Sequence, residues 1–144
     1  MIAIETNILV HAHRPEMPGH AKAKSAIREL VARGRRVGMV GHCLVEFTGV
    51  VTNPRIWKQP SSPAQVRTQV MAWTAPPKVQ VLTEEADFVQ EFIDLVESSG
   101  VHGGGVHDAR IAACCIAHGV RTLWTADRDF GRFPALRTVN PLVT

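Results

Sequence analysis

The chain has 144 residues, of which 45% are hydrophobic and 20% charged, and this composition excludes an intrinsically disordered protein. Its 16 Lys and Arg against 13 Asp and Glu give a formal net charge of +3, a mild excess that permits a nucleic-acid partner without requiring one. No apolar run approaches the ~18 residues of a membrane span, and the first residues show no basic leader. We therefore expect one domain, residues 1–144, that acts in the cytoplasm without a membrane partner.

The three cysteines, Cys43, Cys114 and Cys115, show no C-x-x-C spacing, and two of them are adjacent in an apolar segment. This pattern is typical of buried free thiols in a reducing compartment, and it argues against a zinc site.

Short hydrophobic strands alternate with helical patterns along the whole chain. Strands are predicted at 1–4, 35–41, 78–83, 122–125 and 136–142. Helices are predicted at 8–14, 20–34, 42–53, from Ser62-Pro63 to Pro76, at 84–100 and at 108–118. This alternation is typical of an α/β protein with a three-layer fold, in which helices flank a central parallel sheet of about four to five strands.

The segment 84–100 has the clearest amphipathic pattern. Its large apolar residues share one helical face, and they are Phe88, Phe92, Leu95 and Val96. Gly100 follows this helix and Gly34 follows the helix at 20–34, and both are plausible C-terminal caps. Trp57 and Trp73 bracket the loop and the helix that follow the third predicted helix, and they are interpreted first as local core.

Several carboxylates stand where a predicted strand ends or where the following helix begins. They are Glu5, Glu46, Asp108, Asp127 and Asp129. Because parallel strands end at a common edge of the sheet, we expect acids from distant segments to converge there in one concave pocket. Such a cluster would repel itself unless protonated or neutralised by cations, so at least one of its pKa values should be raised. Several carboxylate oxygens suit Mg²⁺ or Mn²⁺, which can activate water to hydrolyse a phosphodiester.

Each acid also has a simpler interpretation. Glu5 can face solvent at a strand end or precede a helix cap, and Asp108 can itself cap a helix. Asp127 and Asp129 can be ordinary turn residues. Glu46 is harder to dismiss, because its neighbours are apolar and a buried carboxylate needs a partner. The residues alone leave both interpretations open.

Four segments, in chain order, resemble a PIN-domain ribonuclease of the VapC branch, the toxins of bacterial toxin–antitoxin pairs. They are MIAIETNILVHAHR, VEFTGVVTNP, VHDARIAA and LWTADRDFGRFPALRTVNP. The resemblance implies an endoribonuclease that depends on Mg²⁺ or Mn²⁺, forms a homodimer, cleaves an RNA substrate and is inhibited by a cognate antitoxin.

Carried over to this chain, the resemblance implies catalytic roles for Glu5, Glu46, Asp108 and Asp127. It implies metal ligands at Glu5, Asp108, Asp127 and Asp129, with supporting polar residues at Thr6, Asn7 and Thr125. Four arginines lie in or beside the same motifs, and some should meet RNA phosphates; the candidates are Arg14, Arg110 and Arg128, and the fourth is Arg132.

The chain departs from the family pattern at its first acid, where the family has aspartate and this chain has Glu5. One extra methylene moves the carboxylate by about 1.5 Å, so we expect a folded nuclease with attenuated activity. The alternative is a catalytically silent PIN-like domain that binds RNA or a protein partner.

Overall fold

The computed structural model describes residues 1–143, which form one sheet of five parallel strands in the order β3-β2-β1-β4-β5. The strands are β1 (Ile2–Ile4), β2 (Val37–Val40), β3 (Val79–Leu82), β4 (Thr122–Trp124) and β5 (Arg137–Val139). The predicted three-layer α/β fold with a central parallel sheet is confirmed, as are all five predicted strands.

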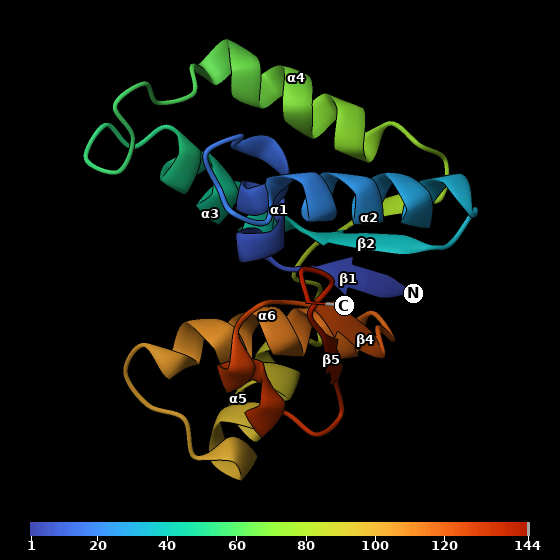
Figure 1. Ribbon diagram of the computed structural model, residues 1–144. Coiled ribbons are helices and arrows are strands. Elements are labelled where there is room, and N and C mark those ends of the chain that lie inside the picture. The colour runs from blue at the N-terminus through green and yellow to red at the C-terminus, as the bar shows by residue number, and fades with distance from the viewer. Residues whose placement is uncertain (144) are drawn as a thin grey trace.

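Helices cover both faces of this sheet (Figure 1). The first four are α1 (Thr6–His13), α2 (His20–Ala32), α3 (Gly41–Val51) and α4 (Pro63–Thr74), and they lie on one side. The other side carries α5 (Phe88–Ser99) and α6 (Gly105–Ala117). Within residues 1–143, no helix is both long and apolar enough to span a membrane.

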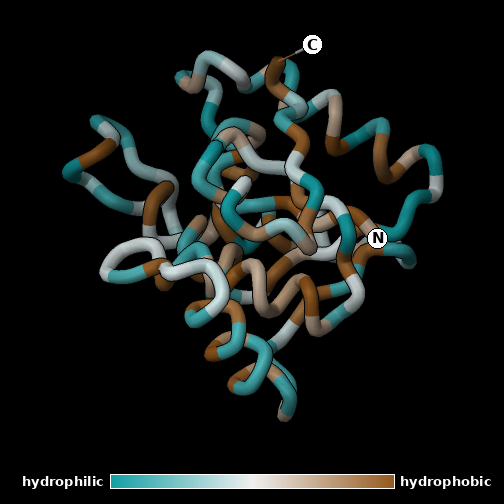
Figure 2. The backbone as a smooth tube through the Cα atoms, turned by 90° about the horizontal axis from the view of Figure 1, so that it is seen from below, coloured by the Kyte–Doolittle hydropathy of each residue, from teal (hydrophilic) through white to brown (hydrophobic). Residues whose placement is uncertain are grey.

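The alternation of side chains along the strands divides the core in two. In β1, Ala3 packs with the α5–α6 layer, whereas Ile4 packs with the α1–α4 layer. Strand β2 follows the same rule, since Met39 and Val40 belong to opposite layers. Hydrophilic residues gather on the outer loops and outward helical turns (Figure 2). The two apolar layers hold the sheet rigidly, and its carboxyl edge therefore provides a stable base for a site.

Local signals at the helix ends are those expected from the sequence. At the start of α4 the Ser62 hydroxyl accepts from Gln65 N at 3.1 Å, while the Gln65 side chain accepts from Ser62 N at 2.8 Å. Gly34 and Gly100 have φ of 65° and 67°, the left-handed conformation that glycine adopts without strain. The four predicted apolar residues of α5 pack against α6 and its neighbours.

Helices α1, α3 and α6 begin one to three residues earlier than predicted, whereas α5 begins at Phe88, four residues later than predicted. Helix α1 starts at Thr6 instead of Ile8, because the Glu5 side chain accepts a hydrogen bond from Asn7 N and caps the helix. Helix α6 starts at Gly105 instead of Asp108, after a turn in which Gly103 has φ of 55°. Asp108 therefore lies within the first turn of α6 and does not precede it.

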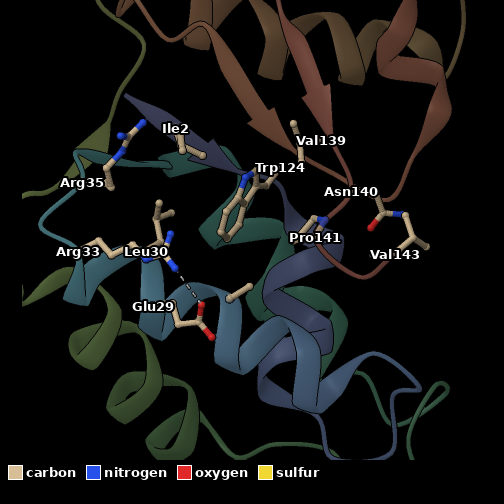
Figure 3. Close-up of a pocket in the computed structure, with 11 residues that line it drawn as sticks. Ile2, Glu29, Leu30, Arg33, Arg35, Trp124, Val139, Asn140, Pro141 and Val143 are labelled. Atoms are coloured by element: carbon tan, nitrogen blue, oxygen red, sulfur yellow. Dashed lines mark ion pairs between the residues drawn. The ribbon is translucent and has the colours of Figure 1, made fainter.

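Part of the sheet face next to α2 is not covered by a helix. Trp124, Val139 and Leu30 line an apolar pocket of about 530 Å³ there, with Arg33 and Arg35 at its rim (Figure 3). The Arg33 guanidinium is already paired with Glu29 at 3.8 Å. None of the predicted acids lines this pocket, so it is not part of the acidic site.

Phe47 is central to the α1–α4 layer, since it is fully buried and its ring packs edge-on against His13 and Trp73 at centroid distances of 5.3 and 5.1 Å. We expect Phe47→Ala to lower the free energy of unfolding by about 3–5 kcal/mol, because it leaves a cavity in a packed core. Ile56→Ala, at a side chain that is 54% exposed, is the control and should change it by less than about 0.5 kcal/mol. Urea unfolding of both variants measures the difference; equal losses would contradict this account of the core.

Candidate metal centre

Glu5 follows β1 directly and is only 6% exposed. One of its carboxylate oxygens, Oε2, accepts hydrogen bonds from Asn7 N at 3.3 Å and from the Thr125 hydroxyl at 3.2 Å. Glu5 is therefore both the cap of α1 and part of a polar network at the carboxyl edge of the sheet.

Thr125 and Asn7 link the ends of β1 and β4. The Thr125 hydroxyl oxygen accepts from Asp127 N at 3.0 Å and from the Asn7 side-chain amide at 3.4 Å. The Asn7 side-chain oxygen in turn accepts from Ala126 N at 3.2 Å. These bonds fix the turn that follows β4, and with it the position of Asp127.

Three aspartates come together beside this network. Asp108 projects from the first turn of α6, Asp127 follows β4, and Asp129 lies in the 3₁₀ helix Arg128–Arg132. One carboxylate oxygen from each lies within 4.8 Å of the others. Asp127 also accepts from Asp129 N at 2.8 Å, which holds the two in a compact turn. We call these three residues the acid triad.

Glu5 and Glu46 form a second acidic group next to the triad. Both line a pocket of about 250 Å³, together with residues that include Thr6 and Asn7. After burial, the charge of Glu46 makes a smaller contribution that raises the pKa of Glu5 and of Asp108. The structure thus divides the predicted acids into two adjacent groups at one edge of the sheet.

Burial and like charge raise the pKa of two of these acids. Burial, and to a smaller extent the charge of Glu46, raises the pKa of Glu5 to about 7, although its hydrogen bonds from Asn7 and Thr125 oppose the shift. Burial and then the charges of Asp127 and Asp129 raise the pKa of Asp108, and nearby Arg132 opposes this. The edge of the sheet therefore favours either protons or cations.

The donor set fits a hard divalent cation. The acid triad offers only carboxylate oxygens, which Mg²⁺ and Mn²⁺ prefer to nitrogen or sulfur. The buried Thr6 hydroxyl lines the pocket beside Glu5 and Glu46, where it is one of the groups that lower the pKa of Glu5.

The candidate phosphate-binding arginines differ in their exposure and in the partners that their guanidinium groups already have. Arg14 is 8% exposed, stacks on Trp57 at 4.3 Å and donates to Glu16, Ser61 and the Gln59 carbonyl. We therefore do not include Arg14 in a phosphate-binding surface. Arg110 pairs with Glu84, and Arg128 is exposed in the 3₁₀ helix.

Sequence reasoning did not select His42, although the structure places it beside the acids. Its buried Nε2 atom has no hydrogen-bond partner among residues 1–143. Burial and the charge of Arg110 lower its pKa, while Glu46 and Glu84 act in the opposite direction. The sequence feature that could have predicted this position is the spacing of four residues between His42 and Glu46, which puts both on the same face of α3.

The PIN domain matches residues 2–136 of the chain. The chain is 31% identical over 142 residues to ribonuclease VapC43 of Mycobacterium tuberculosis, covering 99% of this chain and 96% of that protein. It is 28% identical to ribonuclease VapC48 of the same organism, covering 95% and 94% of the two chains.

The solved structures that share its fold include the following two. One is VapBC2 from Rickettsia felis bound to a promoter DNA fragment, with a TM-score of 0.70 at 21% identity, covering 97% of this chain and 98% of the other. The other is VapC20 of Mycobacterium tuberculosis, a toxin that cleaves the sarcin-ricin loop, with a TM-score of 0.65 at 20% identity, covering 91% and 93%. The parallel sheet, the acids at its carboxyl edge and the match over residues 2–136 show that the chain belongs to the PIN-domain family.

Proposed function

We propose that this protein is a metal-dependent endoribonuclease, the toxin of a toxin–antitoxin pair that acts in the cytoplasm. The observation that carries the proposal is the acid triad, which gathers three carboxylates from α6 and the β4 turn at one point. Relatives named as VapC ribonucleases, similar over almost their whole length, support the choice of RNA as substrate.

Asp108, Asp127 and Asp129 are the residues that would hold Mg²⁺ or Mn²⁺. Bound there, the ion supplies a Lewis acid and lowers the pKa of a water molecule. Glu46 is the acid that we assign to accept the proton of the attacking water, since it shares a pocket with Glu5 and its charge acts on both Glu5 and Asp108. Thr125 and Asn7 keep Asp127 in position through the bonds described above.

Glu5 enters this proposal as the residue that weakens the site. Its carboxylate is engaged by Asn7 N and Thr125 instead of meeting the acid triad. The same observation favours the alternative, a PIN-like domain that binds RNA or a protein without cleaving. Metal-dependent cleavage by the purified chain decides between the two.

The antitoxin is the proposed protein partner, since several structural neighbours are toxin–antitoxin complexes. A groove of about 240 Å³ between α2 and α4 has an apolar floor that includes Ile27, Val31 and Trp73. Lys24 and Arg28 also line it, so it suits an amphipathic helix that carries acidic residues along its edges.

A homodimer would cover further apolar surface. The two helices α3 and α4 carry more apolar residues than one covered face requires, so the sequence predicts that a second copy or the antitoxin covers part of them. In the structure, the side chain of Val45 on α3 is 70% exposed. On α5, Val89 and Ile93 are 65% and 51% exposed and lie one helical turn apart. We propose that a second copy packs against α3.

Asp108→Asn removes one charge of the acid triad without changing side-chain size. We expect RNA cleavage at saturating Mn²⁺ to fall by at least about 100-fold, because residues that only orient metal ligands already contribute 10–100-fold in other proteins. Asp87→Asn is the control, since Asp87 precedes α5 and makes no capping hydrogen bond. Cleavage of purified tRNA and ribosomal RNA is measured with and without a chelator. Activity that survives both the variant and the chelator would contradict the proposal.

Glu5→Asp restores the shorter acid and keeps a residue that caps helices well. We expect cleavage to rise by up to about 100-fold, since a displacement of about 1 Å can cost that much in rate. The melting temperature should change little, because the core residues around Glu5 are untouched. Rates and melting curves of both forms test this; equal rates at saturating Mg²⁺ would show that the site tolerates the longer acid.

Val45→Glu places a charge on the proposed dimer surface. We expect sedimentation velocity to show a shift from dimer to monomer, while the fold is retained because Val45 does not contribute to the core. Ile56→Glu is the matched control at an exposed isoleucine in the loop between α3 and α4, and it should leave the dimer intact. A wild-type protein that sediments as a monomer would contradict the dimer.

A further inference from the structure

Arg132 is the arginine that reaches the acid triad. Its Nε donates to the Asp129 carbonyl at 3.0 Å, and its Nη2 lies 3.6 Å from Asp129 Oδ1. On its other side, a Cβ added to Gly105 would lie 3.0 Å from Nη1, so the missing side chain makes room for the guanidinium at the start of α6. Arg132 therefore spans the gap between the two elements that carry the triad.

The guanidinium is held through Nε and, at a longer distance, through Nη2, and it keeps donors for a ligand. A guanidinium has five N–H donors, and within residues 1–143 only the one on Nε has a hydrogen-bond acceptor. The side chain is 38% exposed, so its two terminal nitrogens remain accessible to a ligand. Arg14 differs, because its donors are already engaged and it is almost completely buried.

We propose that Arg132 is the internal cation of the acidic centre. Its guanidinium partly neutralises the charge of the triad before a metal ion binds. After the metal ion has bound, the same guanidinium pairs with an RNA phosphate. The second part rests on the proposed ribonuclease function. The first part rests only on the position of Arg132 between Asp129 and the start of α6.

Two electrostatic effects follow from this position. A fixed positive charge close to the triad competes with a divalent cation, so Arg132 lowers the affinity of the site for metal. The same charge attracts the phosphate that would bridge to the metal, and a guanidinium can hold two phosphate oxygens at once. Arg132 thus weakens metal binding while it strengthens substrate positioning. A purely structural arginine would not have these two opposite effects.

The test is to measure Mn²⁺ affinity by calorimetry without RNA, and RNA cleavage at saturating Mn²⁺, for the full chain and two variants. Arg132→Gln should bind Mn²⁺ more tightly, on the order of tenfold at low salt, and should cleave RNA at least about tenfold more slowly. Arg132→Lys should return Mn²⁺ affinity to near the wild-type value but leave cleavage low, because an ammonium lacks the two-pronged geometry.

Arg121→Gln is the matched control, an exposed arginine just before β4 and therefore at the opposite edge of the sheet. It should change neither readout. If Arg132→Gln binds Mn²⁺ no more tightly than wild type, or cleaves RNA at the wild-type rate, the inference is wrong. A wild-type chain that binds Mn²⁺ but leaves RNA intact contradicts the proposed function, whereas the Mn²⁺ affinities still decide the first part of the inference.

Discussion

The Thr125 hydroxyl connects the two strand ends on which the acidic centre depends. It donates to Glu5 at 3.2 Å and accepts from Asp127 N at 3.0 Å. The parallel pairing of β1 with β4 brings these groups together, since Ile4 pairs with Trp124 and Glu5 N donates to the Trp124 carbonyl at 2.9 Å. The register of two adjacent strands therefore sets the position of Glu5 relative to Asp127. A slip of one residue in this register would separate the two side chains.

Gathering these acids at one edge of the sheet makes the free energy of folding less favourable. Acids held together at one edge repel one another, and the raised pKa values of Glu5 and Asp108 reflect burial first and this repulsion second. Protons, a divalent ion and Arg132 are three ways to neutralise the same charges. The pH and the metal concentration decide whether the acids are neutralised by protons or by a divalent ion. The helical layers on both faces of the sheet must hold the acids in place in either form.

Glu5 is compatible with the fold at the position that it occupies. The longer acid still caps α1, accepts the Thr125 hydroxyl and remains buried, so the strand, the helix and their packing tolerate it. The proposed effect of the longer acid is on the location of its carboxylate relative to the acid triad. Metal coordination is far more sensitive to such a displacement than helix capping is, because Mg²⁺ demands near-octahedral geometry within a narrow range of distances.

The sequence by itself determined the order of strands and helices, the two-sided burial of the sheet and the set of acids at its carboxyl edge. These features are local, since they depend on the spacing of apolar residues, on caps such as Ser62 and on glycines such as Gly100. Only the tertiary structure decided which acids come together in the acid triad, that Arg14 is buried and that Arg132 reaches the triad. Those outcomes depend on contacts between distant segments, such as the bond between Glu5 and Thr125 across 120 residues, and no local pattern specifies the distance between two side chains so far apart in the chain.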